Sequence, residues 1–463
     1  MDKLLADKVK FDSSLARSIS NKNINYVTKN ICANPFFSSE KMLTELGISL
    51  EQLILIYETI QLEERFHSTI FKNSLFHTSF QILKFILSHP HFFKKVLANK
   101  CYSPFIVEFH ARGPCNNNCI HCYNKQRGYA YSLNNVLTKD DYLRIIDELT
   151  ASDVKYINFS GGLEPLTDRA MFPSILKSID QGFQSTIYTT GLYITKNKLP
   201  YLINLHRIRI SLYGTNADEY QQFTRCKNKE VFTIITKNIQ DLMAFKKAKG
   251  GEVRVSICMM ILPNNYKKML AMTKLAAQLQ IDAIEFRTEF CNQEHLFSKD
   301  MISNVKNIVE QLKLNKNKGI YGDIELDFGE GFYFLNNPEL LEEQQIILRK
   351  NINLCFSSFV KIGIDPWGYI FPCALTTQPG VNLNDLGRFM IESIQGQPKF
   401  SLLEKYNNFI SRSPMGFEVE KCKDKMIKCN VFEGNINAWL GKFYNDKKVG
   451  IELEQQPFYC MKT

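Results

Sequence analysis

The feature that most constrains the fold is an alternation of short β-rich runs with longer helical patterns between residues 105 and 288. The runs that predict strands are Phe105–Ala111, Val154–Ser160, Ser185–Thr189, Arg207–Tyr213, Val253–Ile261 and Ile281–Thr288. Between them, apolar residues recur at helical intervals, and Gly250 with Gly251 marks the end of one helix. Six β-α repeats predict an α/β fold with a parallel sheet, open or curled into a partial barrel. Functional groups in such folds gather at the carboxyl ends of the strands.

Three segments of the chain differ in texture. Residues 1–100 predict a helical N-terminal segment, because Ser49 and Gln52 have the spacing of a capping box before one amphipathic helix and Ser79–Leu87 predicts another. Residues 101–317 predict the sheet and its crossover helices. In residues 318–463 the repeat stops, and Gly, Pro, aromatic and Cys residues become frequent. We therefore expect a separate C-terminal region there.

Composition limits the class of protein. The apolar share of 44% and the charged share of 22% are typical of soluble globular proteins and disfavour disorder or a membrane bundle. The N-terminal residues lack the apolar core of a secretory signal, so we expect a cytoplasmic protein with no membrane contact. The net charge of +10 comes from scattered lysines. It suits an anionic small molecule as well as a nucleic acid.

Thirteen cysteines in a reducing compartment favour metal ligation or thiol chemistry over disulfides. Cys115, Cys119 and Cys122 form a C-x3-C-x2-C pattern on a loop directly after the first predicted strand. Three thiolates suit one soft metal centre and leave one ligand position open. His121 is a poor fourth ligand because adjacent side chains rarely converge on one ion. The open position disfavours structural zinc and favours an exchangeable ligand.

This pattern resembles the radical S-adenosylmethionine (SAM) superfamily, whose fold is a partial (β/α)6 barrel. The resemblance implies that Cys115, Cys119 and Cys122 hold a 4Fe–4S cluster with an open iron site that chelates SAM. One electron from the cluster would release a 5′-deoxyadenosyl radical, which takes a hydrogen atom from the substrate. The cofactors supply this chemistry, and the protein positions them and excludes water.

Motifs at other strand ends resemble the SAM-binding positions of the superfamily. Gly161 and Gly162 would let the backbone approach the methionyl group, and Glu164, after an inserted Leu163, would accept from its ammonium. The resemblance assigns further contacts with SAM to Thr190, Ser211 and Arg225. Ordinary turns and a surface arginine are the alternative interpretations of these positions.

Within the superfamily, the chain most resembles the radical nucleotide-sugar deaminases of desosamine biosynthesis. The likeness rests on Phe159–Thr167, Ile208–Gly214 and Asp218-Glu219-Tyr220, and it covers most of the chain. It implies hydrogen abstraction from a sugar carbon that bears a hydroxyl group, followed by loss of a neighbouring amine or by oxidation. The positive charge would then suit a sugar-like, anionic small-molecule substrate. Arg287 on the sixth strand is a candidate for that anionic group, with a structural ion pair as the alternative.

The C-terminal region departs from those deaminases. Cys355, Gly368 and Cys373 form C-x12-G-x4-C before Cys422 and Cys429, which resembles the auxiliary-cluster extensions called SPASM and twitch domains. The residues from Asp365 to Gly368 predict a hairpin turn that folds Cys355 toward Cys373. Cys355, Cys373, Cys422 and Cys429 would close one auxiliary Fe–S cluster, although the last two are more widely spaced than is usual, and a zinc site is the alternative. An extra cluster would make net oxidation plausible.

The leading hypothesis is a radical SAM enzyme, a lyase or an oxidoreductase, that acts on an amino sugar or nucleotide sugar. The runner-up is a peptide-modifying radical SAM/SPASM enzyme, because such extensions accompany crosslinking, epimerisation or oxidation of precursor peptides. An electron carrier is disfavoured, since it needs neither an open iron site nor the Gly-Gly and Ser motifs. The chemistry implies an electron donor such as flavodoxin or ferredoxin. It implies neither a nucleic acid nor a membrane partner.

Overall fold

The computed structural model describes residues 95, 103–122, 136–288, 297–328, 354–355, 357–372, 392–394, 400–412 and 417–418. Apart from Lys95, the predicted N-terminal helical segment lies outside these residues. Cys373, Cys422 and Cys429 also lie outside them.

A ten-stranded sheet forms the centre of the described structure, in the order β11-β10-β9-β1-β2-β3-β4-β5-β6-β7. All pairs from β9 to β7 are parallel. The six predicted strands are all present, as β1 (Ile106–Ala111), β2 (Tyr156–Gly162), β3 (Gln184–Thr189), β4 (Arg207–Ser211), β5 (Arg254–Ile261) and β6 (Ala283–Thr288). The predicted α/β fold with a parallel sheet is therefore confirmed.

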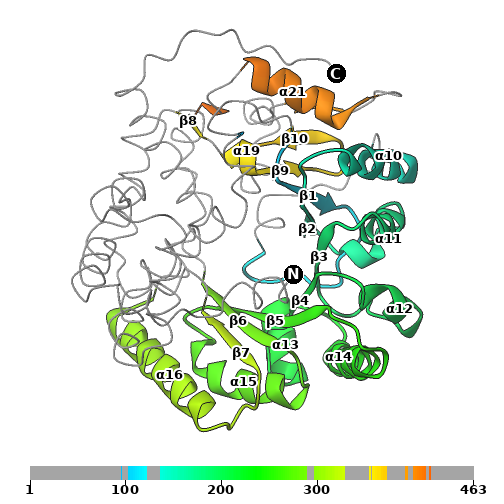
Figure 1. The fold of residues 1–463 in the computed structure, drawn as a ribbon. Coiled ribbons are helices and arrows are strands. Elements are labelled where there is room, and N and C mark those ends of the chain that lie inside the picture. The colour runs from blue at the N-terminus through cyan, green and yellow to red at the C-terminus, as the bar shows by residue number, and fades with distance from the viewer. Residues whose placement is uncertain are drawn as a thin grey trace, which may run out of the picture. The chain divides into compact units, whose positions relative to one another are not determined.

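Helices connect these strands and cover one face of the sheet. In Figure 1 the strands form a curved row with the connecting helices along its outer side. The helices are α10 (Lys139–Thr150), α11 (Phe172–Asp180), α12 (Leu199–Leu202), α13 (Ala217–Thr224), α14 (Glu230–Lys249), α15 (Met269–Gln278) and α16 (Lys299–Asn317), with 3-10 turns η1 (Pro165–Thr167), η2 (Lys196–Lys198) and η3 (Tyr266–Lys268). Gly250 ends α14 in the left-handed conformation, as the sequence predicts. Among the described helices, none is long and apolar enough to cross a membrane.

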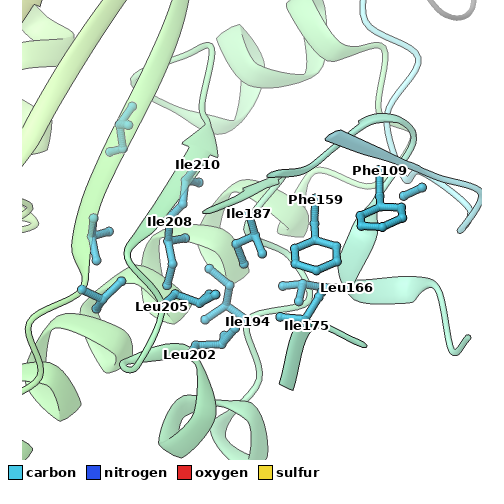
Figure 2. Packing of buried hydrophobic residues seen from close by; sticks show 14 of the residues in the cluster. Phe109, Phe159, Leu166, Ile175, Ile187, Ile194, Leu202, Leu205, Ile208 and Ile210 are labelled. Carbon is cyan, nitrogen blue, oxygen red and sulfur yellow. The ribbon is translucent and has the colours of Figure 1, made fainter. Parts of the chain in front are cut away.

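The helix-covered face of the sheet is apolar. Register places Phe109, Phe159, Ile187 and Ile208 side by side on neighbouring strands, and each is at most 1% exposed. Figure 2 shows this row above Leu166, Ile175, Ile194, Leu202 and Leu205. Side chains alternate along a strand, so the opposite face carries the residues in between. Burial of the apolar row fixes the register and thereby the polar face.

The sheet continues beyond both edges of the six predicted strands. Beyond the boundary predicted at residue 317, β7 (Glu325–Phe328) pairs with β6 in parallel. At the other edge, β9 (Lys361–Ile364) pairs with β1, and β10 (Tyr369–Phe371) and β11 (Glu392–Ser393) follow in antiparallel order. These strands are short, which explains why the β-rich pattern does not reveal them.

Smaller elements complete the C-terminal part. They are α19 (Ser357–Val360), α21 (Leu402–Arg412) and a two-stranded pair of β8 (Leu354–Cys355) with β12 (Phe417–Glu418). Glu148 on α10 accepts hydrogen bonds from the backbone N–H groups of Leu402 and Leu403, at 2.7 and 2.9 Å. A carboxylate at a helix N-terminus is stabilising, so this contact fixes α21 to α10.

The predicted hairpin turn is present between β9 and β10. Gly368 has a φ of 85°, and the Oδ1 atom of Asp365 accepts from the backbone N–H groups of Trp367 and Tyr369, each at 2.9 Å. Asp365 is 1% exposed. Burial raises its pKa to about 7, against the lowering effect of the backbone hydrogen bonds.

This raised pKa predicts a pH-dependent stability. The folded state binds the Asp365 proton more tightly than the unfolded state does. The stabilisation that results is complete below the ordinary pKa of about 4 and is lost as the pH rises through about 7. Asp365→Asn keeps the accepting oxygen but cannot ionise. When the pH rises from 5 to 8, the free energy of unfolding of the wild type should fall by about 1 kcal/mol or more relative to that of the variant. Urea titrations at both pH values measure it, and Asp180→Asn at an exposed position is the control. Parallel pH profiles for Asp365→Asn and wild type would contradict the prediction.

Candidate active site

The cysteine loop begins where β1 ends and is held against the turn after β2. The carbonyl oxygen of Gly113 accepts from the N–H of Glu164 at 3.3 Å, and the Thr167 hydroxyl donates to the carbonyl oxygen of Pro114 at 3.0 Å. A Cβ atom on Gly113 would lie 2.7 Å from both the Asp168 nitrogen and the Glu164 oxygen. Only glycine permits this approach, which fixes where the loop starts.

The end of α13 holds the middle of the same loop. The backbone N–H groups of Asn118 and Ile120 donate to the carbonyl oxygens of Thr224 and Phe223, at 2.7 and 3.1 Å. Arg225 comes next, exposed, with a left-handed φ of 51° that ends the helix. The structure thus brings Arg225 beside the cysteine loop. Its contact with SAM stays a prediction.

His121 belongs to an aromatic cluster. Its ring centroid lies 4.8 Å from that of Tyr213 and 4.9 Å from that of Phe223. Cys119 and Ile120 pack against the same cluster. His121 is thus packed among aromatic side chains next to the cysteine loop.

Cys115, Cys119 and Cys122 are partly exposed, and none forms a disulfide. Among the described residues, no three His, Cys, Asp or Glu side chains lie close enough to surround a single metal ion. In a 4Fe–4S cluster each thiolate binds a different iron, so its ligands stand apart. Three partly exposed thiols on a loop that is held at its start and in its middle fit that group.

Gly162 brings β2 close to the end of β1. Its φ is 52°, and a Cβ atom there would lie 2.1 Å from the carbonyl oxygen of Ala111. The register of the two strands shifts here, so that Ser160 pairs with His110 but Gly162 pairs with Ala111. Gly161 occupies the extra position. Gly161 and Gly162 therefore have a structural role at the base of the cysteine loop. Their contact with SAM stays a prediction.

Glu164 joins the ends of β2 and β3 directly, and Thr190 extends this network to the loop after β1. It is fully buried, its Oε1 atom accepts from the Thr189 hydroxyl at 2.7 Å and from the Leu166 N–H at 3.2 Å, and its Oε2 atom accepts from the Thr190 N–H at 2.7 Å. The Thr190 hydroxyl in turn donates to Asn116 Oδ1 at 3.0 Å. Burial raises the pKa of Glu164, and these hydrogen bonds oppose the increase. The structure thus joins the predicted residues Glu164 and Thr190 to the cysteine loop through contacts within the chain.

Ser211 lies on the polar face of the sheet at the end of β4. Register places it beside Cys258 and, through Cys258, beside Glu285. Cys258 is buried, and its Sγ atom accepts from Arg209 Nη2 at 2.8 Å. Cys258 is therefore part of a polar contact on this face of the sheet. Burial raises the pKa of nearby Tyr213 well above its usual value, so its hydroxyl stays protonated.

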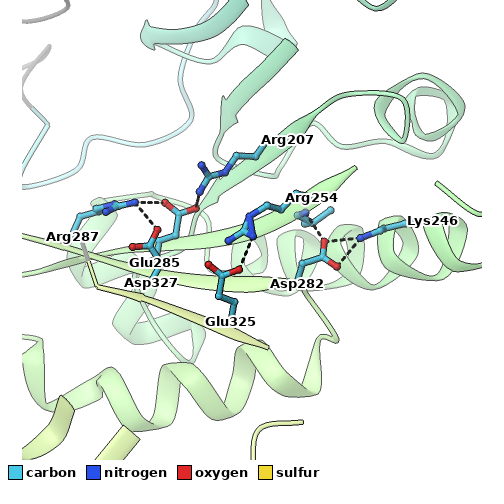
Figure 3. Close-up of polar contacts among 9 residues, drawn as sticks. Arg207, Lys246, Arg254, Asp282, Glu285, Arg287, Glu325 and Asp327 are labelled. Carbon is cyan, nitrogen blue, oxygen red and sulfur yellow. Dashed lines mark hydrogen bonds and ion pairs between the residues drawn. The ribbon is translucent and has the colours of Figure 1, made fainter. Parts of the chain in front are cut away.

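Glu285 is the centre of a charged cluster that sequence analysis identified only at Arg287. Arg207, Arg209 and Arg287 each contact its carboxylate, and Figure 3 shows Arg207 and Arg287 pointing to it. Burial alone would raise the pKa of Glu285, but these arginines hold it at about 2. The available signal was charge at alternate positions of two strands predicted to be buried, Arg207 and Arg209 on one and Glu285 and Arg287 on the other.

A second buried polar cluster lies on the same face at the β1 edge. Glu108 contacts Lys361 Nζ at 2.6 Å and His110 Nε2 at 3.3 Å. Burial would raise the pKa of Glu108, but Lys361 and His110 hold it well below its usual range. Sequence analysis missed this cluster, because Lys361 comes from a strand far along the chain.

Of the predicted auxiliary ligands, only Cys355 lies in the described part of the chain. Its backbone pairs with Phe417 in the two-stranded sheet. Cys373, Cys422 and Cys429 lie outside that part, so the auxiliary cluster stays a prediction.

Replacement of Glu164 tests its joining role. Glu164→Gln keeps the size of the side chain. Its NH2 group replaces one accepting oxygen and faces an N–H or O–H donor, so that hydrogen bond is lost. The free energy of unfolding should fall by roughly 1–3 kcal/mol, and amide hydrogen exchange over residues 113–118 should quicken. Glu230→Gln on the exposed start of α14 is the matched control. Equal stability of the two variants would contradict this account.

Comparisons with known proteins agree with the geometry. The model of the radical SAM superfamily matches residues 113–276, which run from the start of the cysteine loop to α15. The dTDP-4-amino-4,6-dideoxy-D-glucose ammonia-lyase of Streptomyces venezuelae is 30% identical over 378 residues, which cover 78% of this chain and 74% of the relative. The GTP 3′,8-cyclase of Lactiplantibacillus plantarum is 31% identical over 139 residues, 29% of this chain and 41% of the relative.

Among solved structures, SuiB of Streptococcus suis, bound to its precursor peptide SuiA, has a TM-score of 0.50 at 14% identity and covers 78% of this chain and 75% of its own. That likeness concerns the fold alone. The superfamily match includes the three-cysteine loop, and the lyase relative extends over most of both chains. This protein therefore belongs to the radical SAM superfamily, in the family of the dTDP-4-amino-4,6-dideoxy-D-glucose ammonia-lyase.

Proposed function

We propose that this enzyme removes ammonia from an amino sugar that is linked to a nucleotide. The observation that carries the proposal is the 30% identity with the sugar ammonia-lyase over 78% of the chain. In the proposed reaction, a carbon that bears a hydroxyl group loses a hydrogen atom, and the neighbouring amine leaves as ammonia. The product radical then gains one electron from the electron donor and one proton from water, which completes a carbonyl product and leaves 5′-deoxyadenosine as a co-product. The conversion of the sugar needs no oxidant, and the donor supplies two electrons for each molecule of SAM that is cleaved.

Cys115, Cys119 and Cys122 would hold the 4Fe–4S cluster, and the open iron would bind SAM. When bound, this pair would supply the radical that takes the hydrogen atom. The chain's own contribution is to keep the loop in place. Gly113 and the end of α13 fix its two halves through backbone hydrogen bonds, and Thr190 fixes Asn116. These contacts within the chain restrict the loop, which reduces the ordering cost of cofactor binding.

The polar face of the sheet suits a sugar substrate. Next to the aromatic cluster around Tyr213 it carries Ser211, Cys258 and the charged groups around Glu285. These groups donate and accept hydrogen bonds, as recognition of hydroxyl and phosphate groups requires. Tyr213, kept protonated by burial, is a neutral hydroxyl beside the loop and adds no negative charge there.

Two alternatives differ in the product or the substrate. Dehydrogenation would leave the amine in place and would need an electron acceptor, a role for which the predicted auxiliary cluster is suited. Modification of a precursor peptide is the other alternative. The likeness to SuiB concerns only the fold and gives it no support.

The proposal is tested with anaerobically reconstituted enzyme, SAM, dithionite and dTDP-4-amino-4,6-dideoxy-D-glucose. We expect ammonia and 5′-deoxyadenosine to appear together. A dehydrogenated amino sugar without ammonia would overturn deamination in favour of oxidation. Formation of 5′-deoxyadenosine without consumption of amino-sugar nucleotides would overturn the substrate class.

Replacement of a cluster cysteine separates the loop from the other thiols. Cys119→Ala should lower bound iron and abolish formation of 5′-deoxyadenosine, because the cluster loses one of its three protein ligands. Cys226→Ala, at a buried cysteine behind the loop, should leave both unchanged. Iron analysis and chromatography of the nucleoside measure the outcome. Unchanged cleavage in Cys119→Ala would exclude the assigned ligand set.

A further inference from the structure

We propose that Arg207, Arg209 and Arg287, arranged around Glu285, form an anion-binding subsite for the phosphate groups of the substrate. We call these three residues the arginine cluster. The inference rests on the proposed function in that it assigns the nucleotide diphosphate of the substrate to a place in the fold. It is carried by the contacts, charge and position of the cluster.

The buried carboxylate of Glu285 orients the three arginines by contacting each of them. Its carboxylate is fully buried, and Oε2 lies 3.1 Å from Arg209 Nε and 2.9 Å from Arg287 Nη2. Oε1 contacts Arg207. The arginine side chains themselves are 21 to 29% exposed. A buried carboxylate with several partly open arginines is a preorganised cationic surface.

Charge and donor capacity exceed what the internal partners use. Three guanidinium groups face two carboxylates, those of Glu285 and Asp327, which leaves an excess of one positive charge. Arg287 uses Nη2 alone for both carboxylates, each at 2.9 Å. Arg207 Nε is buried and has no acceptor within the described part of the chain. Each guanidinium has five N–H donors, more than the contacts with the two carboxylates use.

The position of the cluster fits the length of a nucleotide sugar. Arg209 lies two residues before Ser211 on the same face of β4, roughly 6.6 Å along the strand. Ser211 neighbours Cys258, and Cys258 neighbours Glu285. Arg209 is therefore about one sugar ring away from the strand end where the sequence predicts contact with SAM, and Arg207, the first residue of β4, lies farther along the same face. A sugar between the two would present its ring to the radical and its phosphate to the arginines.

Two neighbouring ion pairs differ from the cluster. Arg254 pairs with Glu325 at 2.8 Å, and Lys246 pairs with Asp282 at 2.6 Å. Figure 3 shows both beside the cluster. Each joins one cation to one carboxylate, and Arg254 and Glu325 are 33 and 58% exposed. They are structural or surface pairs and serve as internal controls.

The test measures equilibrium binding of dTDP and of inorganic pyrophosphate to the reconstituted enzyme by calorimetry. Arg287→Gln should weaken both roughly tenfold or more, because it removes a charge-assisted bidentate donor. Arg254→Gln should leave both unchanged. Cleavage of SAM without substrate should be equal in Arg254→Gln and the wild type. Equal affinities of Arg287→Gln and wild type, or an equal loss in Arg254→Gln, would overturn the subsite.

A variant with the opposite expected sign guards against simple misfolding. Asp327→Asn removes the carboxylate that competes for Arg287 and raises the local positive charge. It should bind pyrophosphate several-fold more tightly, whereas a purely structural network would give no gain. A loss of affinity in this variant, with an unchanged melting temperature, would count against the subsite.

The same proteins separate this inference from the proposed function. If the wild type releases no ammonia from any amino-sugar nucleotide, yet binds pyrophosphate in a way that depends on Arg287, the subsite holds and the proposed reaction fails. If the wild type deaminates the nucleotide sugar and Arg287→Gln has an unchanged KM, the reaction holds and the subsite fails.

Discussion

The carboxylate of Glu164 is the contact on which the geometry of the candidate site most depends. It accepts hydrogen bonds from the end of β3 and from the turn after β2, and through Thr190 it reaches Asn116 on the cysteine loop. Two strand ends thus share one buried carboxylate, and Thr190 connects them to a third segment, the cysteine loop. A buried carboxylate is costly unless it is hydrogen-bonded. Movement of either strand end would remove a hydrogen bond from the carboxylate and would therefore cost free energy. This coupling keeps the loop in one place.

The two faces of the sheet divide the work of folding and of function. Phe109, Phe159, Ile187 and Ile208 form a continuous apolar row beneath the helices. The alternate positions carry the polar groups, because the side-chain period of a strand is two. The burial that stabilises one face therefore determines the register of the other. Neither a shift of β4 nor one of β6 would keep Arg209 beside Glu285.

Sequence reasoning found the strands and the cysteine loop because both depend on local patterns. The six predicted strands end within two residues of the observed ones. Strand ends can be predicted because apolar runs and turns depend on residues that are neighbours in the sequence. The partners of Glu164 and Glu285 were not predictable, because they come from strands whose register is set only by tertiary packing. Arg225 shows the same limit. Its left-handed backbone and its place beside Asn118 follow from how α13 ends, not from the identity of the residue.

Burial of the charged cluster around Glu285 costs more free energy than burial of an apolar sheet face would. A buried ion network loses hydration that apolar side chains of similar volume would not lose, and such replacements are often neutral or stabilising. The opposite face of β4 and β6 shows that these strands accept Ile208, Ile210 and Phe286 without difficulty. Stability therefore does not explain why arginines occupy the alternate positions. A ligand that replaces the lost hydration with phosphate oxygens does explain it, and it also explains why the arginines remain partly open while the carboxylate that orients them is fully buried.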